Sequence, residues 1–156
     1  MPSEFKHFVI ADTSRFILLD KIDELSLLHK MFETVTTTPT IAKEFGKNLP
    51  AWVRVKSPSN QNYLKLLESE VDRGEASAIA LALENTNTLL ILDDWKARVP
   101  AKKLDLNFTG TLGIFLKAKE VGIIKEIKPS ILKIQKTNFR FSKDTVEEIL
   151  KAANES

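Results

Sequence analysis

Cysteine is absent from the 156-residue sequence, and histidine is scarce. Without cysteine the chain has neither a disulfide framework nor a thiol nucleophile, and this absence fits a reducing compartment. The two histidines, His7 and His29, have no evident acid–base partner, so we expect neither a catalytic nor a ligand role for them. Cysteine catalysis is therefore excluded, and histidine catalysis is not expected.

A large excess of charge of one sign is also lacking. The net charge is only +2 with 28% of residues charged, which describes a solvated globular surface and not a strongly basic nucleic-acid binder. No apolar run is long enough to span a bilayer, and MPSEFKHFVI lacks the apolar stretch of a signal peptide. We therefore expect a cytoplasmic protein that makes no membrane contact and folds as a single domain over residues 1–156.

What the sequence does contain is an alternation of strand-like and helix-like segments. Four segments are β-rich or apolar: HFVIAD at 7–12, TVTTT at 34–38, LLIL at 89–92 and DLNF at 105–108. Helical patterns separate them, and AWVRVK at 51–56 fits either a further strand or an excursion outside the sheet. Strands separated by helices predict an α/β fold of three layers, with a mainly parallel central sheet flanked by helices.

Acidic residues follow two of the predicted strands. Asp12 ends the first strand, Asp93 and Asp94 follow LLIL, and Glu44 lies about one turn into the helix after TVTTT. Because parallel sheets bind ligands at the carboxyl ends of their strands, we expect these acids at one edge. Glu75 opens the helix before LLIL and is a weaker candidate for the same edge.

Each acid also has a simpler interpretation, because carboxylates commonly cap helix N-termini. Capping does not explain why three or four negative charges gather at one edge. Carboxylates a few ångströms apart raise one another's pKa unless a cation neutralises them. Ligation without His or Cys selects hard ions, so the sequence predicts Mg2+ or Mn2+ and, with them, hydrolysis of phosphodiester bonds.

Several motifs resemble those of the PIN-domain family, and more closely its small prokaryotic branch related to VapC-type toxin ribonucleases. They are VIADTS at 9–14, TIAKEF at 40–45, GEASAIALALE at 74–84, LILDDWKAR at 90–98 and TGTLGIFLKAKEVGII at 109–124. The resemblance covers roughly residues 8–150. It implies a PIN fold, RNA cleavage that depends on Mg2+ or Mn2+, a small antitoxin as partner, and a homodimer.

The resemblance also assigns roles to residues. It makes Asp12, Glu44 and Asp93 the metal ligands. Asp94 and Glu75 are supporting acids, and together the five carboxylates form the expected catalytic set. Hydroxyl and guanidinium groups near these acids are candidates for substrate binding: Thr13, Ser14, Arg98, Thr109 and Thr111.

The sequence departs from the family pattern in one place. Where PIN nucleases carry a further acid after the next strand, this chain has NFTGTLG at 107–113. The departure leaves an alternative open, a catalytically inactive PIN-like binding module that retains metal or partner binding. A phosphoacceptor domain of the response-regulator kind is a third interpretation, although such domains place their paired acids after the first strand.

Overall fold

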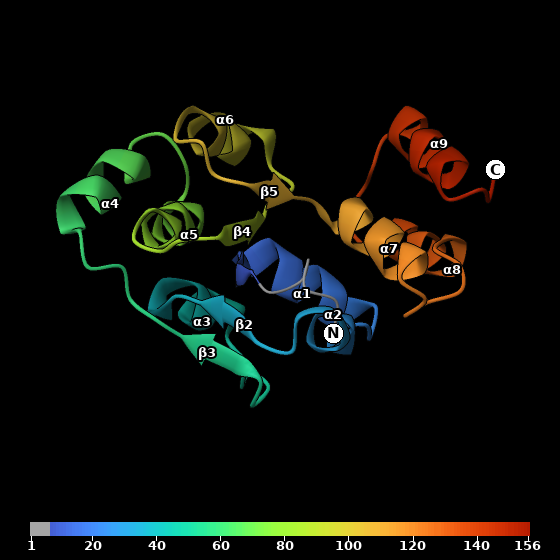
Figure 1. The fold of residues 1–156 in the computed structure, drawn as a ribbon, viewed down its shortest axis with the longest axis horizontal. Coiled ribbons are helices and arrows are strands. Elements are labelled where there is room, and N and C mark those ends of the chain that lie inside the picture. Colours follow the sequence, from blue (N-terminus) through green and yellow to red (C-terminus); the bar gives the residue numbers. More distant parts are fainter. Residues whose placement is uncertain (1–6) are drawn as a thin grey trace.

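The computed structural model describes residues 7–156, and a five-stranded sheet lies at its centre (Figure 1). Its strands are β1 Phe8–Ala11, β2 Val35–Thr37, β3 Val53–Val55, β4 Thr88–Ile91 and β5 Phe108–Thr109. Their order is β3-β2-β1-β4-β5, and every neighbouring pair is parallel. The predicted parallel sheet is thus confirmed. Residues 1–6, where the expected single domain begins, lie outside the described residues.

Helices flank this sheet on both sides, which completes the predicted three-layer α/β arrangement. Those of residues 7–156 are α1 Thr13–Lys21, α2 Ser26–Phe32, α3 Pro39–Phe45, α4 Gln61–Glu68, α5 Arg73–Leu83, α6 Trp95–Lys103, α7 Thr111–Glu120, α8 Lys128–Gln135 and α9 Lys143–Ala152. Figure 1 shows α7, α8 and α9 grouped at one end of the molecule and α4 at the other. None of these helices has the length and apolar character that a membrane crossing demands.

Two segments gain their structure from the tertiary fold. AWVRVK, which fits two interpretations as sequence, forms the edge strand β3 with Val53 buried and Arg54 and Val55 exposed. Helix α8 was not predicted from the sequence, because its N-cap residue is Ile127, which supplies no capping side chain.

Helix α5 lies at the centre of the described domain and contacts β1, β4, α3 and α4. Every residue from Gly74 to Ala82 is buried, and most have small side chains, which allow the neighbouring elements to approach closely. The N-terminus of α5 is thereby held against the carboxyl edge of the sheet, beside the residue that follows β1.

Candidate functional site

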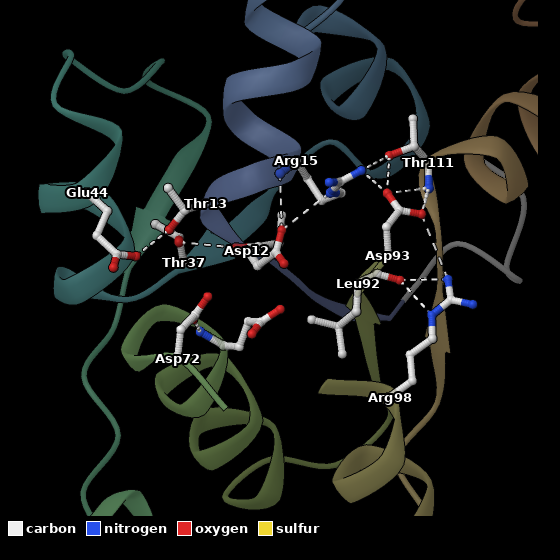
Figure 2. A network of polar contacts seen from close by, with 12 residues as sticks. Asp12, Thr13, Arg15, Thr37, Glu44, Asp72, Leu92, Asp93, Arg98 and Thr111 are labelled. Atoms are coloured by element: carbon white, nitrogen blue, oxygen red, sulfur yellow. Dashed lines mark hydrogen bonds and ion pairs between the residues drawn. The ribbon is translucent and has the colours of Figure 1, made fainter. Parts of the chain in front are cut away.

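The strand register brings the acidic residues of two strands to one edge. Ala11 at the end of β1 pairs with Ile91 at the end of β4. Because the strands are parallel neighbours, Asp12 and the segment starting at Leu92 leave the sheet together. Figure 2 shows Asp12 and Asp93 facing one another at this edge, with Arg15 between them.

Arg15 connects the two acids. Asp12 caps α1, accepting the backbone N–H of Arg15 at 3.1 Å, and the Arg15 Nε lies 3.5 Å from the same carboxylate oxygen. The Nη1 of Arg15 forms an ion pair with Asp93 and donates to the Thr111 hydroxyl at 2.6 Å. Both Asp12 and Arg15 are buried. A buried guanidinium group therefore stands between the two carboxylates that were predicted to share a cation.

Asp93 also forms hydrogen bonds with Thr111, the first residue of α7. Its carboxylate accepts the Thr111 backbone N–H at 3.1 Å and the Thr111 hydroxyl at 2.7 Å. It thus supplies the cap that Gly110, the N-cap residue of α7, lacks. A Cβ at position 110 would overlap both the Asp93 carboxylate and the Arg98 guanidinium, so a larger residue would displace these two hydrogen-bonded side chains. Asp93 serves here as a structural acceptor.

Three further acids form a second group at the same edge. Asp72 caps α5 by accepting the Glu75 N–H at 2.8 Å, and Asp94 caps α6 by accepting the Lys96 N–H at 3.0 Å. A pocket of about 330 Å³ is lined by Asp72, Glu75 and Asp94 together with Lys96 and neighbouring residues of the segment before α5. We call it the acidic pocket.

The charges of this group are poorly neutralised. Burial raises the pKa of Glu75 to about 8, and the nearby carboxylates of Asp72, Asp94 and Asp12 raise it as well. Burial also raises the pKa of Asp12 to about 6, although the charge of Arg15 acts in the opposite direction. Strongly perturbed carboxyl groups that cluster at a sheet edge are typical of functional sites.

The remaining predicted residues lie around this edge. Glu44 is exposed on α3 and accepts the Thr13 hydroxyl at 2.6 Å, and the pair lies against Gly74, where a Cβ would overlap it. Among residues 7–156, no partner is found for the exposed hydroxyl of Ser14. Thr109 lines a different pocket, beside Asp93. The structure thus brings Glu44 to the edge but pairs it with Thr13.

Sequence reasoning missed Arg15 and Asp72. Arg15 lies three residues after Asp12 on one helix, the spacing at which opposite charges meet. Asp72 and Glu75 have the spacing of a capping box, which marks a helix start. Each of these spacings is a local pattern at the start of one helix. Neither spacing shows that Arg15 or Asp72 lies near acids that follow other strands.

The donors at this edge fit a divalent cation in kind. They are carboxylate oxygens, which Mg2+ and Mn2+ prefer. Burial, and to a smaller extent the neighbouring carboxylates, raises the pKa values of Asp12 and Glu75, and a nearby cation would favour their ionised forms. Within residues 7–156, no three acidic or histidine side chains converge closely enough to hold an ion as they lie. Binding therefore requires side chains of the acidic pocket to move together. Asp93 fits less well, because Thr111 and Arg15 occupy its oxygens.

The raised pKa of Glu75 predicts that this charge destabilises the metal-free protein. A carboxyl whose pKa rises on folding from 4.5 to about 8 favours the folded state at low pH, and this contribution is lost as the pH rises through that interval. Glu75→Gln should raise the free energy of unfolding at pH 8 by roughly 1 to 3 kcal/mol and leave it little changed at pH 4.5. Urea unfolding in EDTA measures the free energy of unfolding at both pH values. Glu148→Gln on the exposed face of α9 is the control, and an equal gain for both variants would contradict the assignment.

Thr111 is expected to be structural. Its buried hydroxyl bridges Arg15 and Asp93, so Thr111→Val leaves both charged groups with one hydrogen bond fewer. The free energy of unfolding should fall by about 1 to 3 kcal/mol. The matched substitution Thr86→Val at an exposed loop position should have almost no effect. Equal stability of the two variants in chemical denaturation would show that the bridge is unimportant.

Comparison with known proteins agrees with this geometry. A family model described as a PIN domain matches residues 8–155, nearly the whole chain. No curated protein and no solved structure matches the sequence. The predicted PIN-like fold is confirmed, whereas the assignment to the VapC-type branch stays a prediction. The chain belongs to the PIN-domain family.

Proposed function

We propose that this protein is a ribonuclease that depends on Mg2+ or Mn2+ and hydrolyses RNA phosphodiester bonds at the acidic edge of its sheet. PIN domains are generally metal-dependent nucleases, so membership of the family supports a nuclease-type function. The observation that carries the proposal is the group of poorly neutralised carboxylates at the carboxyl ends of β1 and β4. Burial raises the pKa values of Asp12 and Glu75 to about 6 and about 8.

The geometry favours Asp12, Glu75 and Asp94 as the residues that would hold the ion. Glu75 interacts electrostatically with both Asp12 and Asp94, and within residues 7–156 neither Glu75 nor Asp94 forms an ion pair, whereas Asp12 pairs with Arg15. A divalent ion, when bound, supplies charge that polarises the phosphodiester and acidifies water. Arg15 keeps Asp12 and Asp93 in fixed positions around this group.

The other predicted roles remain predictions. Glu44 and Asp93 as metal ligands would require the release of Thr13 from one and of Thr111 and Arg15 from the other. Substrate contacts predicted for five residues are likewise untested: Thr13, Ser14, Arg98, Thr109 and Thr111. Arg98 is the best placed of them, because its half-exposed guanidinium lies 3.9 Å from Asp93.

A role as the toxin of a toxin–antitoxin pair rests on the resemblance to the VapC-type branch alone. On that basis we propose a small antitoxin as partner, a homodimer and a cytoplasmic location. Light scattering of the purified chain tests the dimer, and relief of growth arrest by the product of a neighbouring gene tests the antitoxin.

One observation favours the second candidate, a PIN-like binding module without turnover. Arg15 already supplies a positive charge to Asp12 and Asp93, so part of the edge is neutral without a metal. Such a module would bind a cation or RNA and leave the RNA intact. The affinity for Mn2+ and the cleavage of RNA, measured on the same protein, distinguish the candidates.

Metal binding should depend on the acidic pocket. Glu75→Gln removes a carboxylate that faces three others, so the dissociation constant for Mn2+ should rise about tenfold or more. Electron paramagnetic resonance of free Mn2+ measures it directly. Asp93→Asn should weaken binding less, because Asp93 is engaged with Thr111 and Arg15. Unchanged affinity in Glu75→Gln would remove Glu75 from the ligand set.

Cleavage should require the same residues. Incubation of a mixed single-stranded RNA pool with the wild type should give fragments in Mn2+ or Mg2+ and none in EDTA. Asp12→Asn should lower the rate by about a hundredfold or more, because it removes the buried carboxylate at the centre of the site. Glu148→Gln on α9 should cut like the wild type. Metal binding without cleavage would establish the binding module instead.

A further inference from the structure

A second pocket, of about 510 Å³, opens beside Asp93 and shares no lining residue with the acidic pocket. Its walls come from α6, β5, α7, the start of α9 and the segments that lead into α6 and α9. The polar and aromatic side chains of its lining are Asp93, Arg98, Phe108, Thr109, Phe141 and Thr145.

The charge of this pocket differs from that of the acidic pocket. Among the described residues, Asp93 is the one carboxylate that lines it, and Asp93 forms an ion pair with the buried Arg15, which also pairs with Asp12. Arg98 is therefore the cationic group that the pocket itself presents, 3.9 Å from Asp93. A phosphate is better accommodated at Arg98 than among the carboxylates of the acidic pocket.

Arg98 is held in place and still has a donor to offer. Its Nε and one terminal nitrogen donate to the Leu92 carbonyl at 2.9 and 2.6 Å, and the guanidinium lies 5.1 Å from the centre of the Phe108 ring. Figure 2 shows the other terminal nitrogen of Arg98 pointing away from Leu92 and Asp93. A guanidinium with two of its nitrogens anchored in this way loses little freedom when the third binds a phosphate oxygen.

The rest of the lining suits a nucleoside. Phe108 and Phe141 are both partly buried aromatic side chains that line the pocket from different segments. Aromatic side chains stack on nucleobases of any sequence, and guanidinium groups add to such stacking. The hydroxyls of Thr109 and Thr145 lie on the same walls and can bind polar edges of a base or sugar. The volume is ample for one nucleotide.

We propose that this pocket binds one nucleotide of single-stranded RNA, with its phosphate at Arg98 and its base against Phe141. The inference rests on the proposed function, because Asp93 and Arg15 connect the pocket directly to Asp12. Bound there, a nucleotide fixes the adjoining strand across the carboxyl edge of the sheet. The low net charge of the chain is then no obstacle to RNA binding, since the cationic groups that matter are local.

The test measures binding without any reaction. Isotope-labelled protein in EDTA is titrated with adenosine 5′-monophosphate, adenosine or inorganic phosphate, and amide shifts are followed by NMR. The monophosphate should bind more tightly than either part alone and should shift the amides around Phe108, Gly110, Gly113 and Phe141. Phe141→Leu and Arg98→Gln should each weaken binding about 5- to 100-fold, the range expected for loss of one stacking or phosphate contact.

Matched controls are Tyr63→Leu, an exposed aromatic on α4, and Arg54→Gln, an exposed arginine on β3. Both should bind like the wild type. The proposal is overturned if the wild type does not bind the monophosphate, if the shifts lie elsewhere, or if Phe141→Leu binds like Tyr63→Leu. Phe141→Leu keeps an apolar side chain, so its fold, checked by thermal melting, should be intact even if that of Arg98→Gln is not.

The outcomes also separate this proposal from the ribonuclease assignment. If the wild type cleaves RNA in Mn2+ but does not bind the monophosphate, the ribonuclease assignment is kept and the nucleotide-binding role of this pocket is rejected. If the wild type binds the monophosphate in this pocket but does not cleave RNA, the nucleotide-binding proposal is kept and the binding module is favoured over the ribonuclease. Equal binding of phosphate and monophosphate would reduce the site to an anion site and overturn the nucleotide proposal.

Discussion

The ion pair between the buried Arg15 and the partly buried Asp93 organises the carboxyl edge of the sheet. Arg15 belongs to α1 and Asp93 follows β4, while Thr111, which bonds to both, begins α7. Three elements that are distant in the sequence are therefore fixed to one another by a single guanidinium. A buried charge left without its partner costs several kcal/mol, so the arrangement is strongly held once formed, whether or not the pair adds net stability.

Arg15 lies between two parts of this edge that differ in charge. On one side, Asp72, Glu75 and Asp94 gather near Asp12, and burial together with these neighbouring carboxylates raises the pKa of Glu75. On the other side, Arg15 pairs with Asp12 and Asp93, and Arg98 adds a further positive charge beside Asp93. A hydrolase acting on a polyanion needs both regions, because a cation must be held by acids while the substrate backbone is held by bases. The net charge of +2 conceals this separation.

The acidic region lowers the free energy of unfolding at neutral pH. Carboxyl groups that are harder to ionise in the folded protein than in the unfolded chain favour unfolding at neutral pH. Such a cost is typical of sites maintained for function. The structural acids elsewhere are different: Glu84 and Glu155, for example, accept backbone N–H groups that lower their pKa values.

The sequence by itself determined the alternation of strands and helices, the parallel sheet, and the position of Asp12, Asp93 and Asp94 at strand ends. These features follow from local periodicity and capping, which depend on residues a few positions apart. Only the tertiary structure decided that Arg15 pairs with Asp93, that the Thr13 hydroxyl donates to Glu44, and that Glu75 lies near the other acids of the acidic pocket. It also decided that AWVRVK forms the edge strand and that residues 128–135 form a helix. The physical reason is that the partner of each of these side chains belongs to another helix or strand. Which groups come within reach depends on how the elements pack, and no short stretch of sequence encodes that packing.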